Sequence, residues 1–107
     1  MADREFGLAL VAAPGEAAEA IARAIVEQKL AACAQVTTDI RSVYWWKGKV
    51  EAATEKLIFI KTTRSRVAPI RELLKSVHPY EVPELIFLPI TAGSDAYLEW
   101  LSEVMGV

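Results

Sequence analysis

Two long strand-like segments within residues 33–62 limit the folds available to this chain of 107 residues. Residues 33–46 are rich in β-branched and aromatic side chains, and residues 50–62 include the continuously apolar run 57–60. A Lys-Gly-Lys turn at residues 47–49 joins the two segments into a hairpin. Each arm is about twice as long as the usual ~5–6 residues of a globular strand, so a small domain cannot cover its far half. We therefore expect the hairpin to project.

The first arm of this hairpin changes the parity of its alternation. Its β-branched and aromatic positions are first even and then odd: Val36, Thr38 and Ile40, followed by Val43 and Trp45. A change of parity turns the other side of a strand toward the core unless one extra residue is inserted. We expect a β-bulge or a bend near residues 41–42.

Two further strands complete the predicted sheet. The apolar run 6–12 is typical of a strand buried on both faces, whereas residues 85–90 contain Pro89, which favours a sheet edge. With a helix after the first strand, a helix after the hairpin and a C-terminal helix, the order is that of a split β-α-β unit. The sequence predicts one α+β domain over residues 1–107, a ferredoxin-like sandwich with a long protruding hairpin and an extra C-terminal helix.

The three helices are predicted from apolar side chains at helical spacing. They cover residues 16–30, residues 65–77, and a last segment for which Ser94 or Asp95 provides the cap. The expected buried stripes are Ala18, Ile21, Ala22 and Ile25, then Val67, Ile70, Leu74 and Val77, and finally Tyr97, Leu98, Leu101 and Met105.

The far half of the hairpin carries Val43, Tyr44, Trp45 and Trp46. An exposed apolar edge strand aggregates unless another chain pairs with it, and tyrosine and tryptophan are typical interface anchors. We expect a homo-oligomer held by the hairpin arms. The alternative is that Trp45 and Trp46 belong to an ordinary core within one chain.

Composition excludes several classes of function. The net charge of −2 has no block of like charges behind it, so we expect no binding to nucleic acid. No apolar run approaches the ~20 residues needed to cross a bilayer, and we expect no membrane association. The single cysteine permits no intrachain disulfide, which agrees with a reducing compartment. We expect a cytoplasmic protein.

Residues 76–84 concentrate polar chemistry in a rigid connector, Ser-Val-His-Pro-Tyr-Glu-Val-Pro-Glu. Pro79 disfavours the helical conformation at His78, so a helix should end just before it and a stiff extended segment should follow. That segment presents an imidazole, a phenol and a carboxylate from His78, Tyr80 and Glu81, which are groups that bind metals or polar ligands. Equally, the histidine could cap the helix C-terminus in a purely structural turn.

Three sequence blocks together resemble the CutA family of divalent-cation tolerance proteins. They are Leu-Ala-Ala-Cys at residues 30–33, Tyr-Trp-Trp-Lys-Gly-Lys at 44–49 and His-Pro-Tyr-Glu-Val-Pro-Glu at 78–84. The resemblance covers essentially the whole chain. It implies a ferredoxin-like homotrimer paired through the hairpin of residues 33–62, which binds copper(II) or other divalent cations loosely and takes part in cytoplasmic metal tolerance.

The same resemblance implies His78, Glu81 and Cys33 as metal ligands. Imidazole and carboxylate suit copper(II), and a thiolate suits copper(I) or zinc. Some relatives have a further cysteine at the end of the first strand, where this chain reads Val-Ala-Ala at residues 11–13. One histidine per chain is few for a tight site, unless copies meet at a subunit boundary and add their ligands. Cys33 could equally be a small buried hydrophobic residue.

A second hypothesis makes the chain a sensor of small molecules, because CutA proteins look like the trimeric PII signal transducers. Tyr44, Trp45 and Tyr80, together with His78 and Glu81, would then line a cleft between subunits. No glycine-rich loop precedes a helix with a phosphate-binding lysine, so a nucleotide is not indicated.

We do not expect an enzyme. A Cys33–His78 pair or a Glu81–His78 pair could act as nucleophile and base, but the sequence shows no third group to orient either pair. A structural scaffold, in which residues 78–81 only brace the oligomer, is the remaining alternative.

Overall fold

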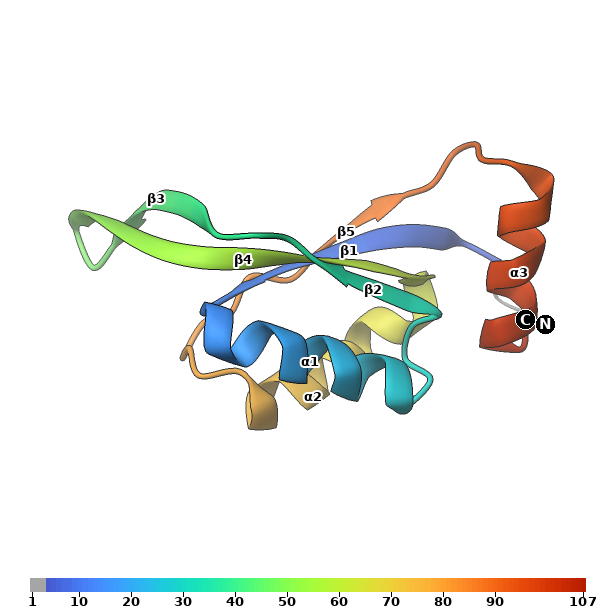
Figure 1. The fold of residues 1–107 in the computed structure, drawn as a ribbon, viewed down its shortest axis with the longest axis horizontal. Coiled ribbons are helices and arrows are strands. Elements are labelled where there is room, and N and C mark those ends of the chain that lie inside the picture. Colours follow the sequence, from blue (N-terminus) through green and yellow to red (C-terminus); the bar gives the residue numbers. More distant parts are fainter. Residues whose placement is uncertain (1–3) are drawn as a thin grey trace.

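The computed structural model of the protein describes residues 4–107, which form an antiparallel sheet with two helices packed against one face and a third helix at one end (Figure 1). The elements in chain order are β1 (Phe6–Ala13), α1 (Gly15–Glu27), β2 (Cys33–Val36), β3 (Ile40–Trp46), β4 (Lys49–Thr63), a 3-10 turn (Arg64–Arg66), α2 (Val67–Val77), β5 (Ile86–Pro89) and α3 (Asp95–Met105).

The strand order β2-β4-β1-β5 confirms the predicted ferredoxin-like α+β fold. β1 pairs antiparallel with β4 over its whole length and with β5 on its other side, so β1 and β4 lie inside the sheet. β2 and β5 form the edges, and Pro89 is the last residue of β5, an edge strand in which a missing amide hydrogen is tolerated. β3 continues the path of β2 along the far half of β4.

The core lies between the sheet and helices α1 and α2. The four residues expected to face inward from α1 are all buried, and alternate residues of β1 and β4 pack against them. Side chains of the core are Ala9, Val11, Ala13, Ala18, Ile21, Ala22, Ile25, Ala31, Ile58, Ile60, Ile70 and Leu74. Among residues 4–107 no helix is long and apolar enough to cross a membrane.

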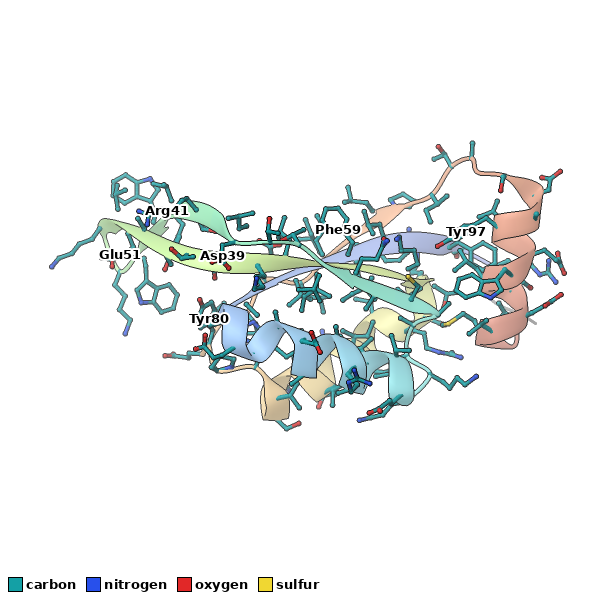
Figure 2. All side chains as sticks on the ribbon, viewed as in Figure 1. Asp39, Arg41, Glu51, Phe59, Tyr80 and Tyr97 are labelled. Atoms are coloured by element: carbon teal, nitrogen blue, oxygen red, sulfur yellow. The ribbon has the colours of Figure 1, made fainter. Side chains whose placement is uncertain are left out.

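The other side of the sheet is apolar and largely uncovered, and we call it the bare sheet face. The strand register places Leu8 opposite Leu88, and Leu10 opposite both Ile86 and Phe59, so these five side chains share one face. Ile86 and Leu88 are 50% and 46% exposed. Figure 2 shows Phe59 on the side of the sheet away from α1 and α2. α3 covers only one end of this face, where Leu101 and Met105 form a small separate cluster.

The β3–β4 hairpin projects beyond the helices, as the sequence predicts (Figure 1). Trp46 pairs with Lys49 across a two-residue turn in which Lys47 and Gly48 have φ of 50° and 80°. Positive φ at both central residues is the signature of a type I′ turn, whose twist matches that of the flanking strands. The turn therefore fixes the register of the whole hairpin.

The extra residue in the first arm is present, but our placement of it near residues 41–42 is wrong. Val36 pairs with Ile58 and Ile40 with Glu55, so three residues, 37–39, face two on β4. Thr37 stabilises this bulge, because its amide donates to the carbonyl of Leu57 and its hydroxyl accepts from the amide of Leu57, each at 2.9 Å. A side-chain hydroxyl thus replaces a missing backbone partner.

Three helix predictions also need correction. α1 ends at Glu27 rather than near residue 30, because Lys29 adopts a left-handed conformation and the amide of Leu30 donates to the carbonyl of Ile25 in a Schellman motif. Val77 and Tyr97 are 37% and 42% exposed, not buried. The buried residue next to Val77 is His78, at the C-cap of α2, and the buried positions of α3 are Leu101, Ser102 and Met105.

The cap of α3 is Ser94, one of the two predicted candidates. Its Oγ accepts a hydrogen bond from the amide of Tyr97 at 3.2 Å.

Candidate functional site

A groove of about 760 Å³ lies between the β3–β4 hairpin and the loop that follows α2, and we call it the hairpin groove. In Figure 2, Tyr80 lies beside the base of the hairpin. The residues that line it include aromatic and acidic ones, namely Tyr44, Trp45, Trp46 and Tyr80 with Glu55, Glu81 and Glu84. Within residues 4–107 no lysine, arginine or histidine contributes to this lining. The groove therefore combines aromatic walls with negative charge.

His78 turns away from the groove and into the protein. It is the C-cap of α2 in an extended conformation, and its amide donates to the carbonyl of Leu74 at 2.9 Å. The ring Nε2–H donates to the carbonyl of Ala12 at 2.8 Å, and Nδ1 accepts from the amide of Tyr80 at 3.1 Å. Both ring nitrogens are therefore occupied in this 8% exposed side chain. Metal ligation by His78 would require breaking one of these two bonds.

Tyr80 carries the same network on to β4. Its hydroxyl donates to Glu55 Oε2 at 2.7 Å, and its ring lies 4.9 Å from that of His78. Burial, followed by the bond to Glu55, raises the pKa of the Tyr80 phenol far above its ordinary range. The chain of contacts from Ala12 through His78 and Tyr80 to Glu55 fixes the loop against β1 and β4.

The acidic residues of the groove lack a counter-charge. Glu55 is only 5% exposed, and the ion pairs formed among residues 4–107 do not include it. Glu84 is exposed as a whole residue, but partial burial of its carboxyl and then the charge of Glu55 raise its pKa above the ordinary value. An incoming cation would offset the cost of keeping this charge out of water.

Cys33 lies far from the groove, at the start of β2. It pairs with Lys61, which pairs with Leu8, whereas His78 bonds Ala12 at the other end of β1. The separation along β1 alone is about 13 Å, at ~3.3 Å per residue. The half-buried thiol lies against Tyr97, and burial, with a further contribution from Cys33, raises the pKa of that phenol.

The predicted ligands therefore do not form one site within a single chain. Glu81 lines the hairpin groove, His78 faces the interior behind it, and Cys33 is at the opposite end of the sheet. Residues 4–107 contain no group of three or more His, Cys, Asp or Glu side chains placed to hold a metal ion. A Cys33–His78 catalytic pair is not formed either.

Tyr44, Trp45 and Tyr80 do line one groove, and their ligand-binding role stays a prediction. Sequence reasoning gave no role to Glu55 or Glu84, although Glu84 belongs to the quoted 78–84 block. The sequence signal available for Glu55 was a single carboxylate at an inward-facing strand position. The burial of Glu55, however, depends on the loop after α2, which comes from a distant part of the chain.

Together, the ferredoxin-like topology, the projecting hairpin and the groove at its base define a class of small α+β proteins that expose a long β arm. Residues 8–104 match the family model described as CutA1 divalent ion tolerance protein, and the chain belongs to this family. The resemblance found in the sequence is confirmed.

Two curated relatives illustrate the match. The chain is 51% identical to Protein CutA, chloroplastic, of Arabidopsis thaliana over 80% of its own length and 47% of the relative. It is 42% identical to the divalent-cation tolerance protein CutA of Thermus thermophilus over 91% of its length and 95% of the relative. The chain thus spans about half the length of plant and animal relatives and nearly all of the bacterial one.

Solved structures match equally well. The divalent cation tolerance protein from Thermus thermophilus superposes with a TM-score of 0.88 at 40% identity, covering 92% of this chain and 96% of the other. CutA1 from Oryza sativa gives 0.88 at 43% identity, covering 92% of each chain. These likenesses extend through the hairpin, since they cover nearly the whole chain.

Proposed function

We propose that the protein binds divalent cations, copper(II) most tightly, and acts in metal tolerance as a homotrimer. The observation that carries this proposal is the buried carboxylate of Glu55, which has no cationic partner among residues 4–107 and shares a groove with Glu84 and Glu81. A cation at this place would offset the charge that burial makes unfavourable. Cation tolerance also appears in the names of the bacterial relatives from Thermus thermophilus and Citrobacter koseri.

The preference for copper(II) is inferred from the general order of affinities of divalent metals, and not from a complete set of ligands in the groove. For a given nitrogen and oxygen site, affinity rises from manganese to copper and falls again at zinc. Three carboxylates from one groove are a weak set on their own, so we expect loose binding by a single chain. Copies that meet at a subunit boundary would add ligands and tighten the site.

Three unpaired surfaces support a homotrimer assembled through the hairpin of residues 33–62. The bare sheet face is one of them, and the outer edges of β2 and β5, which pair with nothing else among residues 4–107, are a second. The third surface is the hairpin itself, on which Val43, Trp45 and Val50 are 70%, 74% and 58% exposed. Apolar surface of this extent is normally covered by another chain. A cytoplasmic location, which suits a single free cysteine, is part of this proposal.

Calorimetric titration with copper(II), zinc and manganese tests the metal site. We expect copper to bind tightest to the wild type, and Glu84→Gln to weaken it about tenfold, equivalent to ~1.4 kcal/mol. Glu51→Gln is the matched control, because Glu51 is an exposed acid of β4 outside the groove lining. Unchanged copper affinity in both Glu84→Gln and Glu55→Gln would place the metal elsewhere and overturn the proposal.

A further inference from the structure

The hairpin groove also has the chemistry of a site for an organic cation. Its aromatic walls and three carboxylates enclose about 760 Å³, which is within the usual range for small-molecule sites. No basic side chain of the described residues lines it, so an anionic ligand would meet only repulsion. A neutral ligand would leave the charge of Glu55 uncompensated.

One cation of the chain already uses an aromatic wall of this groove. The Nζ of Lys47 lies 5.6 Å from the centroid of the Trp46 ring. An ammonium at this distance from a tryptophan face is attracted by the ring quadrupole. Lys47 lies in the exposed hairpin turn and does not line the groove. The contact is an example, within this chain, of an ammonium group held against the Trp46 ring.

The ligand count separates an organic cation from a metal ion. A metal needs several donor side chains, and residues 4–107 provide no cluster of three. An alkylated ammonium needs no coordinating ligands, because aromatic faces and a nearby carboxylate together replace its weak hydration. Tyr44 and Trp46, which the β3–β4 register places on the same side of the hairpin as Glu55, supply the faces, and Glu55 supplies a buried negative charge.

We propose that the hairpin groove binds a small alkylated ammonium ion, held between the aromatic side chains of β3 and the carboxylates of Glu55 and Glu84. This goes beyond the proposed metal binding, since it assigns the groove a ligand that needs no metal. The two ligands would compete where both occupy the groove.

The test uses metal-free protein in chelator, with choline as the cationic probe and 3,3-dimethyl-1-butanol as its neutral isostere. Indole N–H resonances of the three tryptophans are followed by NMR. Trp46 should shift saturably with choline, and the isostere should bind at least tenfold more weakly. Trp100 on α3, which does not line the groove, is the internal control and should not shift.

Two variants then separate charge from aromatic contact. Glu55→Gln keeps an oxygen that accepts from Tyr80 but removes the charge, and it should weaken choline binding about tenfold. Trp46→Leu changes a half-exposed residue, so the fold should persist, and it should weaken binding several-fold in a calorimetric titration with choline. Glu51→Gln should bind as the wild type does.

Equal binding of choline and its isostere, equal shifts at Trp100 and Trp46, or the absence of any saturable shift would overturn the proposal. Failure of copper binding would leave this experiment unaffected, because it is carried out in chelator. Conversely, loss of choline binding in a protein that still binds copper would overturn only the organic-cation site.

Discussion

Both nitrogens of the His78 ring are used inside the protein, one toward the carbonyl of Ala12 and the other toward the amide of Tyr80. The sequence singled out this residue because it is the only histidine and is followed by proline. Whether its ring points outward or inward depends on a carbonyl 66 positions away, which no local pattern reveals. Of the two interpretations of residues 76–84, the contacts favour the structural brace for His78, whereas Glu81 lines the hairpin groove and its role as a ligand stays a prediction.

Replacing His78 by alanine should therefore cost stability more than metal binding. The change leaves the carbonyl of Ala12 without a partner and opens a buried space, at a cost of about 2–4 kcal/mol. Denaturant unfolding measures the loss, and copper titration of the folded variant should give the same stoichiometry as the wild type. A stable His78→Ala protein without copper binding would show instead that the ring is a ligand.

The Tyr80 hydroxyl should matter because it satisfies the buried Glu55 carboxylate. Tyr80→Phe removes this donor while keeping the ring, and we expect a loss of about 1–3 kcal/mol in the free energy of unfolding. Tyr44→Phe changes another tyrosine of the same groove without removing a bond to Glu55, so it is the control and should stay within ~0.5 kcal/mol. Equal effects of the two substitutions would show that the bond to Glu55 contributes nothing.

Glu84 should make stability depend on pH in the acidic range. Its pKa in the folded protein is raised above the ordinary value of 4.5, so the folded state binds the proton more tightly than the unfolded state. Its contribution to stability is therefore present below 4.5 and is lost as pH rises through the raised pKa. Thermal unfolding of Glu84→Gln should lack this decline, whereas Glu51→Gln should retain it. A wild type whose unfolding temperature rises with pH more steeply than that of Glu84→Gln would contradict the sign.

At the scale of elements, periodicity predicted which segments form strands and helices better than it predicted their ends. The stripe of α1 was correct because a helix that packs on a sheet must bury a face of fixed spacing. The end of α1 and the bulge at residues 37–39 were misplaced, because Lys29 and Thr37 act through backbone conformation and a side-chain hydrogen bond. Neither lysine nor threonine indicates such a feature in a sequence by itself. Lysine, in particular, rarely takes the place of glycine in a left-handed helix cap.

Alanine substitutions at two glycines, Gly7 and Gly48, would disturb the sheet for different reasons. A Cβ at Gly7 would lie 2.1 Å from the Phe87 ring and 2.7 Å from the carbonyl oxygen of Leu88, so Gly7→Ala should displace β5 from β1. At Gly48 a Cβ meets nothing within 4 Å, and only the positive φ opposes it, at a cost of about 1–2 kcal/mol.

We expect Gly7→Ala to be the more damaging substitution, with hydrogen exchange accelerated at β5. Gly48→Ala should accelerate exchange in β3 and leave β5 protected. Lys49→Ala, at the neighbouring strand position, is the control. Equal protection of β5 in the wild type and Gly7→Ala would show that the edge adapts without loss.

On the scale of the whole molecule, the sheet carries helices α1 and α2 on one face only. The order of elements predicted this architecture, because two right-handed crossovers place both helices on the same side. The local patterns of one chain do not show what covers the other face. The projecting hairpin and the family resemblance were the sequence features that pointed to a partner. The homotrimer and the cytoplasmic location therefore stay predictions.

A charge on the bare sheet face should separate the subunits. Leu88→Arg places a cation on exposed apolar surface, and we expect light scattering to give the mass of one chain, 11.8 kDa, instead of three. Val77→Arg is the matched control, since Val77 is an exposed valine at the end of α2 on the other side of the sheet. A trimer that survives Leu88→Arg would exclude this face from the subunit contact.

The two-residue turn at the hairpin tip also has a consequence for biosynthesis. A hairpin with a type I′ turn forms in about 1–10 μs, long before a nascent chain delivers β5 or meets another copy. For that interval its apolar segment from Val43 to Val50 is exposed to solvent and to other nascent chains without protection. Lys47 and Lys49 interrupt this segment, in the manner of gatekeeper charges that slow edge-to-edge aggregation. The two lysines at the tip of the hairpin, one in the turn and one at the start of β4, would thus keep newly made chains apart.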